Sequence, residues 1–98
     1  MSAKLRIENA IDYLYQSKKS LCCEEVKSLL VGLGFEVRDG KQGGHKIFFH
    51  QGLPSFQSGS FNCGHGKNPE IKPAYIGKII QILKQYREEL EQYLEETS

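Results

Sequence analysis

One histidine of this chain stands where a glycine-rich turn meets a predicted strand, in the segment GGHKIFFH at residues 43–50. Histidine titrates closer to neutral pH than any other side chain, so it can accept or donate a proton during a reaction. The glycines before it carry no β-carbon and let the backbone of a ligand approach. His45 is therefore a candidate acid or base catalyst. A structural or merely exposed histidine is the alternative that spacing alone favours.

Several polar residues near this segment are candidates for binding phosphate groups. A lysine binds phosphate as a point charge, and a second histidine could supply a proton. The candidates are Lys41, Gly44, Lys46, His50, His65, Lys67 and Lys72. Each lysine has a simpler interpretation as a solvated charge, and His50 has one as the end of a strand. No P-loop, dinucleotide fingerprint or carboxylate pair is present, so we predict neither a nucleotide-dependent enzyme nor a cofactor.

The three cysteines are Cys22, Cys23 and Cys63. The count is odd and adjacent cysteines rarely bridge each other, so we expect free thiols in a reducing compartment. Cys63 and His65 could join a zinc site with Cys22 or His45, but no second pair of ligands has the spacing of a zinc knuckle. We therefore predict no metal site.

The 98-residue chain is long enough for one small domain with a modest core. Residues 1–87 contain 13 basic and 7 acidic side chains, a balance of +6, whereas residues 88–98 contain 5 acidic and no basic side chains, a balance of −5. A basic body with an acidic end suits a domain that binds polyanions, and equally a solvated helix end. No apolar run is long enough to span a bilayer, and charges interrupt the N-terminal segment, so we expect a cytoplasmic protein without membrane contact.

Apolar periodicity predicts three helices. The first covers about Ala3 to Gln16, with an apolar stripe of Ile7, Ala10, Ile11 and Leu14. The second has Ser20 as its expected N-cap, ends at Gly32 and Gly34, and has a stripe of Cys22, Val26, Leu29, Leu30 and Leu33. A single long C-terminal helix opens at Pro73, with a stripe of Ile76, Ile79, Ile80, Leu83, Leu90 and Leu94.

Between the second and third helices the pattern changes to that of a small sheet. Residues 35–38 alternate in period 2, residues 39–44 have the composition of a turn, and residues 45–50 form a second strand of a hairpin. A loop at residues 51–60 precedes a short third strand around residues 61–63, and residues 64–72 form a polar loop.

The order α-α-β-β-β-α predicts an α+β fold, a three-stranded antiparallel sheet with helices packed on one face. The apolar stripes of the first and last helices extend beyond what a minimal core of this kind needs. We expect these two helices to pack against each other within one chain, leaving the acidic side chains of the C-terminal end outside. Pairing of the stripe with a second copy or with another protein is the alternative.

Two segments, GFEVRDGKQGGHKIFFH and HGKNPEIKPAYIGKIIQIL, resemble the HicA (YcfA-like) family of small mRNA interferase toxins over about residues 20–84. That family has a G-S-H-h-x-[FY]-x-[HK] strand after a Gly/Lys-rich turn, and later a helix start containing Lys-Pro. Two motifs in the family's order are more specific than either alone. Here Gly44 replaces the usual serine, and Lys46 stands where histidine is common. Around this core, residues 1–19 add a helix and residues 85–98 an acidic helical extension to a single HicA-like domain.

The resemblance implies a double-stranded-RNA-binding-domain-like fold and a metal-independent ribonuclease acting on mRNA, with His45 at the position of the family's catalytic histidine. It also implies a HicB-like antitoxin protein that binds the enzyme and blocks it. We expect the free protein to be a monomer or weak dimer. A non-catalytic RNA- or DNA-binding module of the same fold is one alternative, and a degenerate toxin kept as an interaction partner is another.

Overall fold

The computed structural model describes residues 2–41, 43–64 and 69–97. Its elements are α1 (Ala3–Gln16), α2 (Cys23–Gly32), β1 (Glu36–Asp39), β2 (His45–Phe49), β3 (Gly59–Asn62), α3 (Pro73–Gln85) and α4 (Arg87–Thr97). The predicted α+β class and element order are confirmed, except that the last helix is divided in two. None of the helices in the described ranges is long and apolar enough to cross a membrane.

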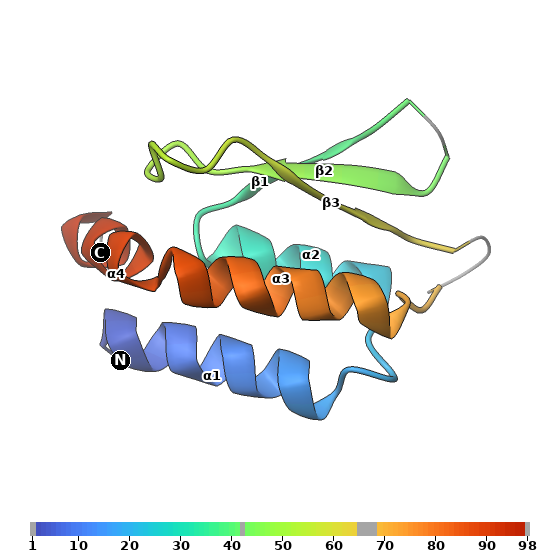
Figure 1. Ribbon diagram of the computed structural model, residues 1–98, viewed down its shortest axis with the longest axis horizontal. Coiled ribbons are helices and arrows are strands. Elements are labelled where there is room, and N and C mark those ends of the chain that lie inside the picture. The colour runs from blue at the N-terminus through green and yellow to red at the C-terminus, as the bar shows by residue number, and fades with distance from the viewer. Residues whose placement is uncertain (1, 42, 65–68, 98) are drawn as a thin grey trace.

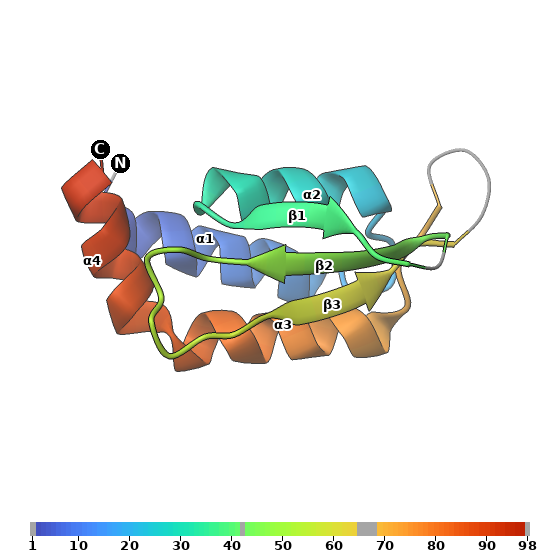
Figure 2. The same cartoon turned by 90° about the horizontal axis from the view of Figure 1, so that it is seen from above.

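The three strands form one antiparallel sheet in the order β1-β2-β3, and all helices lie on one side of it (Figure 1). Seen from above, β1 lies over α2 and β3 over α3, while α1 lies beyond these two helices, on the far side from the sheet (Figure 2). The other face of the sheet is open, because no described helix covers it. This one-sided packing was predicted from the order of the elements.

The strand register decides which side chains point into the core. Val37 is paired with Phe48, which is fully buried, so this pair faces the helices. Arg38 is paired with Ile47 on the open face, and His45 is paired there with Asn62. Residues of a strand alternate between faces, so the first residue of β2 belongs to the open face.

The buried residues form one continuous cluster, with Phe48 near its middle. The rings of Phe35, Phe56 and Phe61 surround Phe48 at centroid distances of 5.6 to 6.0 Å. Phe56 and the fully buried Leu53 come from residues 51–60, which the sequence predicted only as a loop. Their burial was missed because apolar residues in an irregular segment have no period that points to one face.

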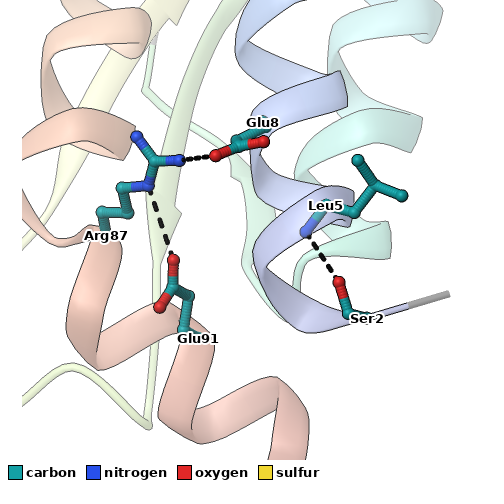
Figure 3. Close-up of polar contacts among 5 residues, drawn as sticks. All are labelled: Ser2, Leu5, Glu8, Arg87 and Glu91. Atoms are coloured by element: carbon teal, nitrogen blue, oxygen red, sulfur yellow. Dashed lines mark hydrogen bonds and ion pairs between the residues drawn. The ribbon is translucent and has the colours of Figure 1, made fainter.

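The predicted packing of the first helix against the C-terminal end of the chain is confirmed. The apolar stripe of α1 is buried and packs against α3 and α4. Arg87 at the start of α4 forms an ion pair with Glu8 of α1 and lies 3.5 Å from the Glu91 carboxylate (Figure 3). On its other side, α1 contacts α2 through the Tyr13 hydroxyl, which donates a 2.6 Å hydrogen bond to the Glu25 carboxylate.

The prediction of a single long C-terminal helix is wrong, because α3 ends at Gln85 and the chain turns at Tyr86 before α4. The Tyr86 ring packs against Phe56, and its hydroxyl donates a hydrogen bond of 3.2 Å to the Ser55 carbonyl. The turn allows Leu90 and Leu94 to be buried beside α1. Apolar periodicity is the same on both sides of this turn, so it could not reveal the break.

Three predictions that involve this part of the chain and its cysteines are also wrong. The N-cap of α2 is Cys22 rather than Ser20, and Cys23 rather than Cys22 faces the core, with 6% of its surface exposed. Cys23 forms a disulfide with Cys63, at a Cα–Cα distance of 5.5 Å, and only Cys22 remains a free thiol. The bonded pair is 40 residues apart in sequence, so the two cysteines meet only in the folded chain, where the residue after β3 lies beside the first residue of α2.

Candidate active site

His45 is the first residue of β2 and lies half-buried on the open face of the sheet. Its ring nitrogen Nδ1 is 2.8 Å from the side-chain oxygen of Asn62, its register partner on β3. The Asn62 amide nitrogen in turn donates a 2.8 Å hydrogen bond to the hydroxyl of Tyr75 on α3. Three elements therefore contribute to one polar chain that ends at the imidazole.

With the Asn62 amide in this orientation, Nδ1 of His45 carries the proton. The Asn62 amide nitrogen is directed at Tyr75, so its oxygen is the atom that faces His45. A carbonyl oxygen can only accept a hydrogen bond, so Nδ1 must be the donor. The neutral imidazole then has its lone pair on Nε2, which has no hydrogen-bond partner among the described residues. Nε2 is the atom that can accept a proton from a bound ligand.

The hairpin turn between β1 and β2 packs against the His45 ring. The Gly40 amide donates a 2.8 Å hydrogen bond to the His45 carbonyl, closing the turn. A β-carbon on Gly40 would overlap the ring carbon Cδ2 of His45. Glycine at position 40 therefore allows the imidazole to lie against the backbone of the turn, which limits the ring to one orientation.

Gly44 is required by its own backbone conformation. Its φ angle is +83°, which favours glycine, and a β-carbon there would overlap the carbonyl oxygen of Cys63. The Cys63 amide donates a 2.7 Å hydrogen bond to the Gly44 carbonyl, and the disulfide holds Cys63 against α2. The serine that the resembled family carries at this position does not fit this conformation. The departure from the motif therefore has a structural cause.

The predicted phosphate-binding lysines differ in their surroundings. Lys46 forms an ion pair with Asp39, and its hydrogen bond holds the pKa of the Asp39 carboxyl below the usual range. The ammonium of Lys46 therefore already has a carboxylate partner. Lys41 in the hairpin turn and Lys72 at the start of α3 are exposed and have no ion-pair partner among the described residues. These two lysines remain available to a phosphate group.

His50 lies in the core, with 6% of its surface exposed, so it is not placed to contact a ligand as the sequence suggested. Its Nε2 donates a 3.0 Å hydrogen bond to the Leu33 carbonyl, and its Nδ1 accepts one from the Gly52 amide at 3.0 Å. Burial lowers the pKa of this imidazole. His50 ties the end of β2 to the end of α2, a structural role. The remaining candidates, His65 and Lys67, lie outside the described residues.

Sequence reasoning missed Asn62 and Tyr75, the two residues that orient His45. The register of β2 against β3 places Asn62 opposite His45, but that register was not predicted. Within the described residues, no three histidine, cysteine or acidic side chains are close enough to hold a metal ion. Cys63, considered as a zinc ligand, is instead committed to the disulfide.

Comparisons of the chain with protein-family models, with curated proteins and with solved structures found no match in any of the three. The resemblance to the HicA family therefore stays a hypothesis that rests on the two sequence motifs.

Proposed function

We propose that the protein is a toxin-type endoribonuclease that cleaves mRNA by acid–base catalysis at His45, and that an antitoxin-like protein inhibits it. The observation that carries this proposal is the hydrogen bond from His45 to Asn62 at the rim of the open sheet face, which leaves Nε2 without a hydrogen-bond partner in the described part of the chain. The order of the Gly-rich turn, the histidine and the strand supports the same conclusion through the family resemblance.

The chemistry needs a group that can take up and return a proton. In RNA cleavage a base removes the proton of the 2′-hydroxyl, and the 2′-oxygen attacks the neighbouring phosphorus. The bond to the 5′-oxygen then breaks, and that oxygen takes a proton as it leaves. The lone pair of His45 Nε2 would accept the first proton, and the resulting imidazolium would supply the second. Asn62 would keep Nδ1 protonated throughout and stabilise the imidazolium by accepting its hydrogen bond.

Positive charge beside the phosphate assists this reaction, because negative charge grows on the phosphate oxygens in the transition state. Lys41 precedes His45 in the hairpin, and Lys72 begins the helix that contains Tyr75. Both are exposed, so they can reach a phosphate without first breaking an ion pair with a described residue. Lys46 contributes less in this proposal, because its ammonium already binds Asp39.

The test compares purified wild type with His45→Ala on a defined mRNA transcript in the presence of EDTA. His45 is only half-buried, so the alanine variant should keep the far-UV circular dichroism of the wild type. We expect cleavage by wild type and a loss of at least about a hundredfold in the variant, since a general base contributes about 10²–10⁴ in rate. Equal cleavage by both proteins contradicts the proposal. RNA binding without cleavage by wild type identifies the non-catalytic binding module instead.

The antitoxin part of the proposal has its own test. The gene should have a neighbouring reading frame whose product, when coexpressed, forms a complex with this protein and relieves growth arrest. We expect the arrest to require His45, because the His45→Ala protein would have no activity to inhibit. Arrest that persists with His45→Ala would point to binding rather than cleavage as the toxic event.

A further inference from the structure

A groove between α1 and α3 is lined by lysines. Two open hollows of about 450 and 390 Å³ adjoin each other there and share Tyr15 and Lys18. The lysines lining them are Lys18, Lys19, Lys78 and Lys84. Among the described residues that line these two hollows there is no aspartate or glutamate. We call this surface the α1–α3 groove.

These lysines are not neutralised within the part of the chain that the structure describes. Its ion-paired cations are Arg38, Lys46 and Arg87, none of which lines the α1–α3 groove. Lys18 follows the end of α1, and its side chain reaches α3, where its ammonium lies 3.5 Å from the position that a β-carbon on Gly77 would occupy. Lys18 therefore brings a positive charge from the end of α1 onto the surface of α3.

A third hollow continues from the groove past Tyr15 and Lys84, and is lined there by Glu8, Asp12 and Arg87. Arg87 forms an ion pair with Glu8. The excess of positive charge is therefore confined to the two lysine-lined hollows, and this is where a polyanion would be attracted.

An exposed aromatic ring stands in the middle of the groove. Tyr15 is 70% exposed and lines all three hollows. Because the Tyr15 ring is exposed between lysines, it contributes nothing to the packing of the core. It is the arrangement that a single-stranded nucleic acid needs, with lysines for the phosphates and an aromatic face for an unpaired base. A double helix keeps its bases stacked inside, and an acidic peptide has no base to stack.

The α1–α3 groove is connected to the His45 site. The Lys78 ammonium lies over the ring of Tyr75, 5.8 Å from its centroid, and the Tyr75 hydroxyl accepts the hydrogen bond from Asn62. The C-terminal end of α1, the start of α3 and the hairpin turn all lie at the same end of the molecule (Figures 1 and 2). Tyr75 therefore links the His45 site to Lys78 of the α1–α3 groove.

We infer that the α1–α3 groove binds single-stranded RNA that extends from the His45 site, with Lys18, Lys78 and Lys84 on phosphates and Tyr15 stacked on a base. The path of the strand rests on the proposed ribonuclease function. The binding itself does not depend on cleavage, because the groove contains no group that the proposed reaction uses.

The experiment measures binding of a fluorescein-labelled, fully 2′-O-methylated single-stranded RNA to the wild-type protein, by anisotropy at several salt concentrations. This RNA has no free 2′-hydroxyl and cannot be cleaved by the proposed route. The double variant Lys18→Ala/Lys84→Ala should bind more weakly, with a salt slope smaller by about 1.4, since each phosphate contact on a single strand contributes about 0.7. The matched control is Lys4→Ala/Lys27→Ala, which has the same net charge but changes exposed lysines outside the groove. It should keep the wild-type slope.

The aromatic contact has its own pair of variants. Tyr15→Ala should weaken binding roughly tenfold through loss of stacking, whereas Tyr15→Phe should bind like wild type. Equal losses in the two lysine doubles, or equal affinity for a duplex of the same sequence, overturn the inference. The inference is also overturned if polyglutamate displaces the RNA and Tyr15→Ala has no effect on binding. That result would assign the groove to an acidic protein.

The two proposals can fail separately. If the groove variants lose binding but wild type leaves unmodified RNA intact, the ribonuclease proposal fails and the RNA-binding groove stands. If wild type cleaves RNA while the groove variants bind and cleave equally well, the groove inference fails and the ribonuclease proposal stands.

Discussion

Replacing Gly44 with serine, the residue that the resembled toxin family carries there, should destabilise this protein. The φ angle of +83° costs a non-glycine residue about 1–3 kcal/mol. The new β-carbon would also overlap the Cys63 carbonyl oxygen, so the backbone must move. That movement would break the hydrogen bond from the Cys63 amide to the Gly44 carbonyl, at a cost of about 1 kcal/mol. The two costs together amount to about 2–4 kcal/mol.

The neighbouring Gly43 provides the matched control. No described atom lies within 4 Å of the place where its β-carbon would be. Serine at either position lowers the entropy of the unfolded chain, a gain of about 0.4–1 kcal/mol that is common to both variants. The difference between the two unfolding free energies therefore isolates the cost in the folded state, for which we expect about 2–4 kcal/mol.

The assay is urea unfolding followed by far-UV circular dichroism, with wild type, Gly43→Ser and Gly44→Ser in the same buffer. Gly43→Ser should be as stable as wild type or slightly more stable, and Gly44→Ser clearly less stable. Equal stability of the two variants would refute the argument from backbone conformation. Because Gly44 precedes His45 and contacts Cys63, the residue after Asn62, the Gly44→Ser protein should also lose more RNA cleavage than the Gly43→Ser protein.

Two further predictions concern stability. The Cys23–Cys63 disulfide closes a loop with a sequence separation of 40, so a reductant should lower the unfolding free energy of wild type by about 4 kcal/mol, measured by urea titration. Cys22→Ser should respond to the reductant like wild type and Cys63→Ser should not respond; an insensitive wild type contradicts the prediction. Burial lowers the pKa of His50, so the folded state disfavours its protonation. Stability should therefore be full above about pH 6.5 and fall as the pH drops below that value, because the unfolded chain then binds the extra proton. His50→Gln should remove this fall, and an unchanged pH profile in that variant would show that other groups cause it.

The local sequence pattern was enough to predict the helices and strands whose apolar residues recur at a regular spacing. The apolar stripe of α1 and the helix end at Gly34, with its φ of +96°, follow from spacing and from glycine chemistry. The hairpin that begins β2 at His45 follows from alternation and turn composition. Spacing also indicated that α1 and the C-terminal end would cover each other, because both stripes were too long to leave in water.

Other features depend on residues that are distant in sequence. The break at Tyr86 arises because that side chain packs against the irregular segment after β2. The disulfide joins the residue after β3 to the first residue of α2, and His50 in the core donates a hydrogen bond to the carbonyl of Leu33. No periodicity within one element carries this information, since each contact joins two elements.

The candidate site also combines features that local sequence predicts with features that depend on tertiary contacts. The sequence alone determined that a histidine would follow flexible glycines at the start of a strand, because residue type and turn composition are local properties. Only the tertiary structure decided that Asn62 and Tyr75 would orient that histidine, and that Lys18, which follows α1, would lie beside α3. Hydrogen bonds and charges act over a few ångströms in space, and the fold alone determines which distant residues come within that range.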